Sequence, residues 1–149
     1  MKIFRRAAAV VTAAIGLALI ATALALAADP FATWLTEDKK GKIHIVNCGG
    51  ALCGNLVWIQ EPMDPETNKP KLDKHNVDAS KQGRPLLGIP IVLDMKPNGA
   101  DKWEGQVYNA EDGNTYSGSF TMTGANSAQL KGCIMGGLLC KAQTWTRAN

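Results

Sequence analysis

Residues 103–122 constrain the fold more than any other part of this chain, because they predict two strands joined by a tight turn. Asp112-Gly113 is a strong hairpin signal, since Gly113 can adopt the left-handed backbone conformation that closes such a turn. On the returning strand, larger or glycine residues alternate with Thr and Ser, which is typical of a strand with one buried face. The expected buried set is Tyr116, Gly118, Phe120 and Met122. A β-sheet is therefore the expected organising unit.

The first 28 residues have the pattern of a signal peptide. A short positive segment, residues 1–6, precedes an apolar run, residues 7–26, and Ala-Leu-Ala at residues 25–27 offers a cleavage pattern. The run is also near the length of a membrane span, so an uncleaved anchor is the alternative. Its Ala-rich composition and the adjacent cleavage pattern favour removal. The sequence thus predicts a signal peptide over 1–28 and one domain over 29–149, with no stable membrane span after cleavage.

Export changes the meaning of the positive net charge. Of the 16 basic residues, Lys2, Arg5 and Arg6 lie in the leader, which leaves 13 to balance the 13 acidic residues. A nearly neutral mature chain gives no support for nucleic-acid binding. We expect a periplasmic or secreted protein, typical of a Gram-negative bacterium, that is a monomer.

Four cysteines remain in the mature chain, at positions 48, 53, 133 and 140. An even count in an exported chain indicates two disulfides, for which three pairings exist. Pairing Cys48 with Cys53 and Cys133 with Cys140 is favoured, because each pair brackets a Gly-Gly reversal. A four-thiolate metal site is the less favoured alternative, since these loops lack the usual two-residue spacings. Neither a metal nor a cofactor is expected.

The rest of the chain predicts short strands at regular spacing and no amphipathic helix. Besides the central hairpin, strands are expected within residues 31–37, 42–48, 54–60, 85–95, 128–134 and 139–147. Residues 61–84 carry Pro, Asp, Asn and Gly throughout and predict one long loop, which in a small domain is often a lid or a binding loop. About eight antiparallel strands in a flat sheet would leave two unpaired edges, so an all-β meander closed into a barrel is expected.

A small barrel is either filled by side chains or holds one small ligand. The candidate ligand contacts are aromatic residues of the sheet and two polar residues of the long loop, with ordinary core packing as the alternative for each aromatic. They are Trp58, Asn68, Arg84, Trp103, Tyr116 and Phe120. Arg84 could hold an anion at the barrel mouth, but pairing with Asp64 or Asp73 to tie down the loop is favoured.

No motif for catalysis or metal binding stands out. Residues 64–68 place oxygen ligands at alternate positions, but Lys69 stands where a calcium loop needs Gly, so a turn is favoured. No nucleophile-elbow, zincin or phosphate-loop pattern occurs, so a catalytic set is not expected. His44 alternates onto the exposed side of its strand. His75, in the long loop, is the better candidate for a pH-sensitive or metal-linked role, with a solvated histidine as the alternative.

Several motifs occur in an order that resembles an exported bacterial family known as uncharacterised domain family 2147. They are Trp34, Cys48-Gly-Gly-Ala-Leu-Cys53-Gly54, residues 64–68, Arg84-Pro-Leu-Leu-Gly88, Trp103-Glu-Gly, Tyr108-Asn, Asp112-Gly-Asn-Thr-Tyr116-Ser-Gly, Leu130-Lys-Gly-Cys133 and Gln143-Thr-Trp145-Thr-Arg147. The resemblance covers the mature chain. It implies a β-barrel similar to lipocalins and fatty-acid-binding proteins, and no established activity.

The likeness to lipocalins implies a structural role for two residues. Lipocalins stack a tryptophan of the first strand against an arginine that follows the last strand, and Trp34 and Arg147 look like these positions. Ala32 stands where the lipocalin pattern has Gly.

Three functions are compatible with these features. The leading hypothesis is a non-enzymatic periplasmic barrel that binds a small apolar or amphipathic molecule, or an envelope protein at its mouth. The second is an envelope interaction or assembly module without a cavity. The third is an envelope hydrolase or isomerase, which would need Asp64, His75 and Arg84 in one cleft.

Overall fold

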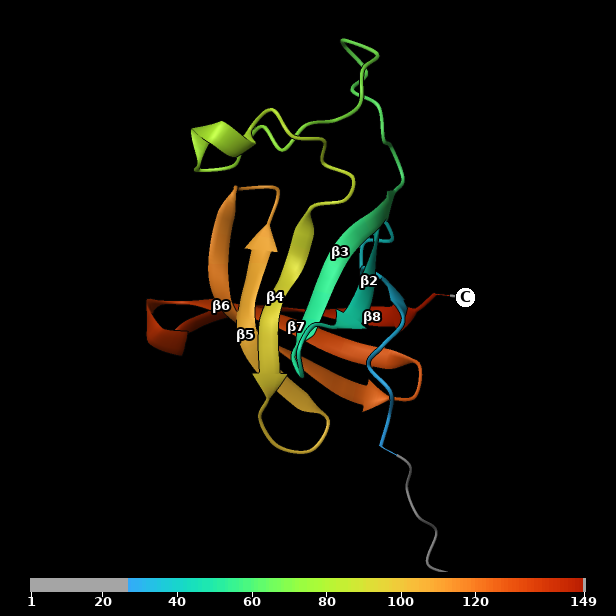
Figure 1. The fold of residues 1–149 in the computed structure, drawn as a ribbon, viewed down its shortest axis with the longest axis vertical. Helices are drawn as coiled ribbons and strands as arrows, with labels where there is room; N and C mark the ends of the chain where they lie inside the picture. Colours follow the sequence, from blue (N-terminus) through green and yellow to red (C-terminus); the bar gives the residue numbers. More distant parts are fainter. Residues whose placement is uncertain (1–26, 149) are drawn as a thin grey trace, which may run out of the picture.

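The computed structural model describes residues 27–148, so the signal peptide expected over 1–28 lies almost wholly outside the described residues. Within 27–148 the chain forms eight strands, each antiparallel to the next, and β1 also pairs with β8 (Figure 1). The strands are β1 (Thr33–Leu35), β2 (Gly41–Asn47), β3 (Leu52–Ile59), β4 (Pro90–Pro97), β5 (Lys102–Asn109), β6 (Asn114–Gly124), β7 (Ser127–Ile134) and β8 (Leu139–Arg147). The predicted all-β meander closed into a barrel is confirmed.

Strand β4 begins later than the sequence suggests. Residues 85–89 belong to the loop, where Pro85 forms only an isolated bridge with Leu72. Pro90 is the first residue of β4, a position that suits a residue with no N–H for the ladder. Further along, the register of β4 against β5 shifts between Leu93 and Lys96. A Cβ on the facing Gly105 would lie 2.7–2.8 Å from β4 backbone atoms, so this bulge requires glycine.

The predicted long loop connects β3 to β4 over one end of the barrel (Figure 1). It contains one 3₁₀ turn, η1 (Ala79–Lys81), which the Pro-, Asp-, Asn- and Gly-rich sequence of the loop does not predict. Asp78 caps this turn by accepting a hydrogen bond from the Ser80 backbone N–H. The turn at residues 64–68 is closed by the Asp64 carboxylate, which accepts from the backbone N–H groups of Glu66 and Thr67. These bonds hold the Asp64 pKa below its usual range.

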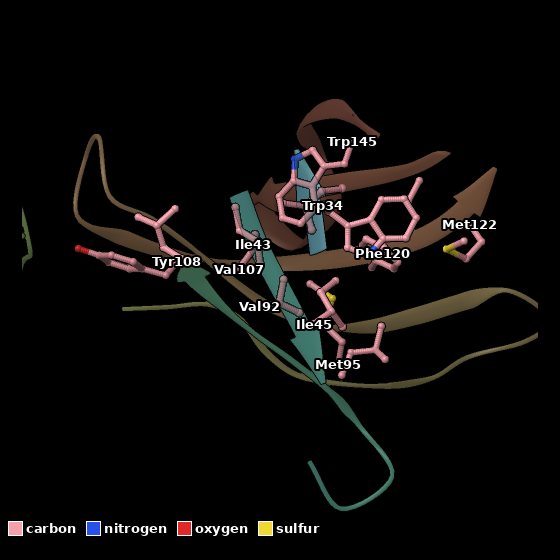
Figure 2. Close-up of a cluster of buried hydrophobic side chains, with 14 of the residues drawn as sticks. Trp34, Ile43, Ile45, Val92, Met95, Val107, Tyr108, Phe120, Met122 and Trp145 are labelled. Atoms are coloured by element: carbon pink, nitrogen blue, oxygen red, sulfur yellow. The ribbon is translucent and has the colours of Figure 1, made fainter. Parts of the chain in front are cut away.

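The end of the barrel away from the long loop is filled by aromatic side chains (Figure 2). Phe120 is fully buried, and its ring centroid lies 5.6 Å from Trp34, 6.1 Å from Trp145 and 6.2 Å from Trp103. Trp34 also donates from Nε1 to the Pro30 carbonyl oxygen. This end is therefore closed by packing.

Arg147 completes the closed end as the lipocalin likeness implies. It pairs with Trp34 across the β1–β8 ladder, and its guanidinium carbon lies 4.8 Å from the Trp34 ring centroid. The same guanidinium donates to the Ala125 and Asp29 carbonyl oxygens. Arg147 thus joins the seam of the barrel to the segment that precedes β1.

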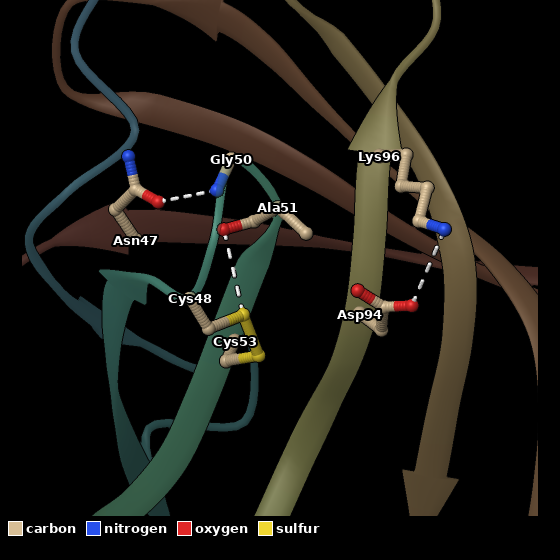
Figure 3. The surroundings of a disulfide bond; sticks show 7 residues. All are labelled: Asn47, Cys48, Gly50, Ala51, Cys53, Asp94 and Lys96. Carbon is tan, nitrogen blue, oxygen red and sulfur yellow. Dashed lines mark hydrogen bonds and ion pairs between the residues drawn. A yellow bond between two sulfur atoms is a disulfide. The ribbon is translucent and has the colours of Figure 1, made fainter.

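Both favoured disulfides are present. The Cys48–Cys53 bond spans the β2–β3 turn, where the Asn47 side chain accepts a hydrogen bond from the Gly50 N–H (Figure 3). The Cys133–Cys140 bond joins directly paired residues of β7 and β8. Each disulfide therefore crosslinks the two strands of a hairpin that is also paired by backbone hydrogen bonds.

The two bridges should differ in their effect on stability. Next to Cys53, Leu52 is fully buried, so replacing Cys48 and Cys53 by serine should lower the free energy of unfolding by about 2 kcal/mol. Replacing Cys133 and Cys140 should do less, because the end of that hairpin is exposed and can fray alone. Urea denaturation of both double variants tests this ranking, and the reverse order would contradict it.

Candidate functional site

The barrel is open and hollow at the end where the long loop lies. A cavity of about 1180 Å³ extends from Trp145, at the edge of the aromatic cluster, to the mouth. Its inner wall is apolar, and its rim carries charged side chains from the β1–β2 turn, the long loop, the β5–β6 turn and β8. The apolar wall includes Ile43, Leu56, Ile91, Val107 and Leu130, and the charged rim includes Glu37, Asp38, Lys40, Glu61, Lys71, Glu111, Asp112 and Lys141.

Small residues on the inner faces of the strands explain why this end is hollow. Gly41 and Gly132 occupy inward-facing positions in the cavity wall. At the closed end, inward-facing positions carry tryptophan and phenylalanine instead. A Cβ on Gly132 would lie 3.2 Å from the Val107 side chain, which leans over the glycine. The wall is therefore lined mainly by short aliphatic groups, and its aromatic members are Tyr108, Tyr116 and Trp145.

Most charges of the rim already have partners. Lys71 lies 3.6 Å from Glu61, and Glu37 accepts a hydrogen bond from the Thr144 backbone N–H. Lys40 and Lys141, in contrast, have no carboxylate within 4.0 Å in the described part of the chain. The mouth therefore offers two cations to an incoming group.

Tyr116 brings a hydroxyl to the same wall. Its OH donates to the Asp112 carboxylate at 2.6 Å, and this bond raises the Tyr116 pKa. Burial raises the pKa of Asp112, but the bonds from Tyr116 and Asn114 outweigh it and hold that pKa below its usual range. The pair is an ionised carboxylate with a neutral phenol at neutral pH.

A buried polar cluster anchors the long loop to β5. The Asp73 carboxylate is 1% exposed and accepts from the Tyr108 hydroxyl at 2.5 Å, the Asn76 amide at 2.9 Å, and Nε and Nη2 of Arg84, both at 2.9 Å. Figure 2 shows the Tyr108 hydroxyl pointing away from the aromatic end. Arg84 therefore ties the loop to Asp73, as favoured from the sequence, and Asp64 is not its partner.

The β5–β6 turn supports the loop from the other side. Gly113 has a φ of 74°, as the hairpin signal predicted, and a Cβ there would overlap the His75 carbonyl. Val77 donates its backbone N–H to the Gly113 carbonyl at 3.3 Å. The loop held in this way contributes Glu61, Lys71 and Leu86 to the cavity rim.

The anchor predicts an unusual tyrosine titration. Burial, and then the bond to Asp73, raise the pKa of Tyr108 to about 12. An unfolded tyrosine titrates near pH 10, so this contribution to stability is complete below about pH 10 and is lost as the pH rises through 12. Absorbance at alkaline pH should show a late phenolate step that Tyr108→Phe removes. A single step near pH 10 in the wild type would contradict the anchor.

The six residues predicted to contact a ligand lie in different parts of the structure. Tyr116 lies on the cavity wall, while Phe120 and Trp103 pack in the closed end. Trp58 lies on the outer face of β3, with the Lys42 ammonium 5.1 Å from its ring centroid. Asn68 is exposed in the turn that begins at Asp64, and Arg84 is held by Asp73. Tyr116 is thus the one member of that set among the residues that line the cavity.

The wall residues that sequence reasoning missed are mainly aliphatic. Ile43, Leu56, Val107 and Leu130 all occupy inward positions in the strand alternation. Strand alternation predicts which side chains point inward, but not which of them line a cavity. Gly41 and Gly132 in the sequence indicate that the mouth end of the barrel has few bulky side chains.

The structure does not join the three groups of the hydrolase hypothesis. Asp64, His75 and Arg84 do not line the cavity, and no hydrogen bond connects any two of them. His75 is exposed, as is His44, which contacts the Thr33 hydroxyl at 3.0 Å.

In residues 27–148, no three His, Cys, Asp or Glu side chains are grouped to hold a metal ion. In the same residues, no helix has both the length and the hydropathy for crossing a membrane.

The barrel, its Trp–Arg closure and its open mouth define a lipocalin-like protein. By structure the chain is similar to protein HP1028 from the human pathogen Helicobacter pylori, described as belonging to the lipocalin family. The TM-score is 0.68 at 20% identity, over 82% of this chain and 84% of that one, which shows a shared fold. The chain belongs to the family described as "Uncharacterized protein conserved in bacteria (DUF2147)", whose model matches residues 32–147. A comparison with curated proteins finds no match.

The two disulfides also bear on where the protein resides. All four cysteines are paired, and such bonds persist in oxidising compartments outside the cytoplasm.

Proposed function

We propose that this protein is a periplasmic binding protein that holds a small apolar or amphipathic molecule in the open half of its barrel. The observation that carries the proposal is the division of the interior into two halves. Aromatic rings fill the closed end, and a cavity with an aliphatic wall occupies the mouth.

The chemistry of the cavity favours an amphipathic ligand. An alkyl or aryl portion would displace water from the wall of Ile43, Leu56 and Val107, at about 0.8 kcal/mol for each buried methylene. Lys40 and Lys141, which have no carboxylate partner in residues 27–148, would face a carboxylate, sulfonate or phosphate head group. A molecule with one apolar part and one acidic end therefore suits both surfaces.

The signal peptide predicted over residues 1–28 and the closed fold support the proposal of a periplasmic monomer. Cleavage near residue 28 would leave Trp34 and the segment before it free to close the barrel floor, as the Pro30 and Arg147 contacts require. The closed sheet exposes few unpaired edges for self-association.

A fluorescent amphipathic anion, 1-anilinonaphthalene-8-sulfonate, tests the proposal. Val107→Phe places a ring in the cavity and should weaken binding at least about tenfold, because the ring takes the volume of the aromatic probe. Val46→Phe makes the same change on an exposed position of β2 and should leave binding unchanged. Circular dichroism checks that both variants are folded. Equal binding by the two variants would show that the probe does not enter the barrel.

A further inference from the structure

The end of the β7–β8 hairpin carries apolar side chains that nothing in the described chain covers. Met135 is 69% exposed and Leu138 is 80% exposed, and their neighbours Ile134 and Leu139 are also exposed. We call residues 134–139 the hairpin tip. None of them belongs to the buried core or packs against it. A group of four large apolar residues at one projecting turn is a mark of an interaction site.

The backbone holds the tip away from the barrel. Figure 1 shows the hairpin, in orange and red, extending sideways beyond the other strands and apart from the long loop. The Cys133–Cys140 bond clamps the two strands directly below the tip. Gly136 and Gly137, with φ values of 66° and 95°, then reverse the chain within η2 (Met135–Gly137) and its neighbours. The crosslink therefore presents the apolar residues on a short, fixed turn.

The charged residues of the β7–β8 hairpin itself are all positive. No Asp or Glu follows Asp112 in the sequence, whereas Lys131 and Lys141 lie in β7 and β8 just below the disulfide. Glu104 of β5 lies two strands away from Lys131, since Ser119 of β6 is in register with both. Its carboxylate forms an ion pair with Lys102 at 2.5 Å. Lys141 has no carboxylate within 4.0 Å among residues 27–148. The tip thus combines exposed apolar groups with two nearby cations.

We infer that the hairpin tip binds the surface of an anionic lipid bilayer. Apolar side chains insert among the acyl chains, and the lysines below them meet the phosphate layer, which is the general pattern of interfacial binding. This inference goes beyond the proposed ligand binding and does not depend on it.

Vesicle co-sedimentation of the oxidised protein, expressed from its full coding sequence, tests the inference. One set of vesicles is phosphatidylcholine, and the other is an equal mixture with phosphatidylglycerol. The wild type should pellet with the anionic vesicles, and the double variant Met135→Ser, Leu138→Ser should bind at least about tenfold more weakly. Lys131→Gln with Lys141→Gln should weaken binding to the anionic vesicles alone. All variants share one N terminus, so any contribution of residues 1–28 cancels.

The matched control is Val77→Ser, which removes an equally exposed apolar residue from the long loop and should leave binding unchanged. A wild type that stays in the supernatant with both vesicles would overturn the inference, as would equal pelleting of the tip variant. Sedimentation equilibrium without lipid gives a third outcome. A dimer that the tip variant abolishes would mean that a second copy covers the tip, and the bilayer assignment would be wrong.

Discussion

Phe120→Ala is expected to lower the free energy of unfolding by about 3–5 kcal/mol, the largest effect of any single change considered for this chain. Phe120 is fully buried, and three tryptophan rings lie within 6.2 Å of its centroid. Truncation would leave a void bounded by Trp34 and Trp145, which cannot collapse because their strands form the barrel seam. The closed end would lose the packing that holds β1 against β8.

Urea denaturation monitored by tryptophan fluorescence measures this effect. Phe31→Ala provides a matched control, because Phe31 is 42% exposed and its removal should change stability by less than about 1 kcal/mol. A loss below about 1 kcal/mol for Phe120→Ala would mean that the closed end is loosely packed, and the division of the barrel into a filled and an open half would fail.

Asp73→Ala is expected to lower the free energy of unfolding by about 3 kcal/mol. The carboxylate is buried and accepts four hydrogen bonds, from Tyr108, Asn76 and Arg84. Its removal leaves the Tyr108 hydroxyl and the Asn76 amide buried without this acceptor. The guanidinium of Arg84, which is partly exposed, would turn to water. The long loop would then lose its attachment to β5.

Asp64→Ala is the control for the loop. Asp64 is only partly buried and closes a local turn, so its removal should leave global stability nearly unchanged. Hydrogen exchange should show faster opening across the whole loop in Asp73→Ala and only near residues 64–68 in Asp64→Ala. Equal exchange in the two variants would indicate that the buried cluster does not hold the loop.

Much of the fold could be predicted from local patterns. The alternation of residues 114–122, the Asp112-Gly113 turn and the need to remove sheet edges together predicted the closed meander, because each depends on neighbouring residues or on a general property of sheets. The bounds of β4 were less predictable. Where Pro85 and Pro90 both interrupt an apolar run, tertiary pairing decides which residues join the ladder.

The site was harder to predict because it depends on the position of each inward-facing residue along the barrel axis. Alternation placed Phe120 and Tyr116 on the same face, yet the first packs in the closed end and the second lines the cavity. Tyr108 illustrates a different obstacle. It follows the inward-facing Val107 in β5, and its hydroxyl is bound by a loop more than 30 residues earlier in the chain. Strand periodicity carries no signal for such a contact.

Native mass spectrometry of protein purified from its own cells without denaturation shows whether the open half of the barrel holds a ligand. We expect a fraction of molecules with a mass above that of the oxidised chain, by the mass of one small molecule. Val107→Phe should lose this addition, while Val46→Phe should retain it. If the wild type shows only the mass of the oxidised chain and also fails to bind the anionic probe, the open half of the barrel is not a binding site.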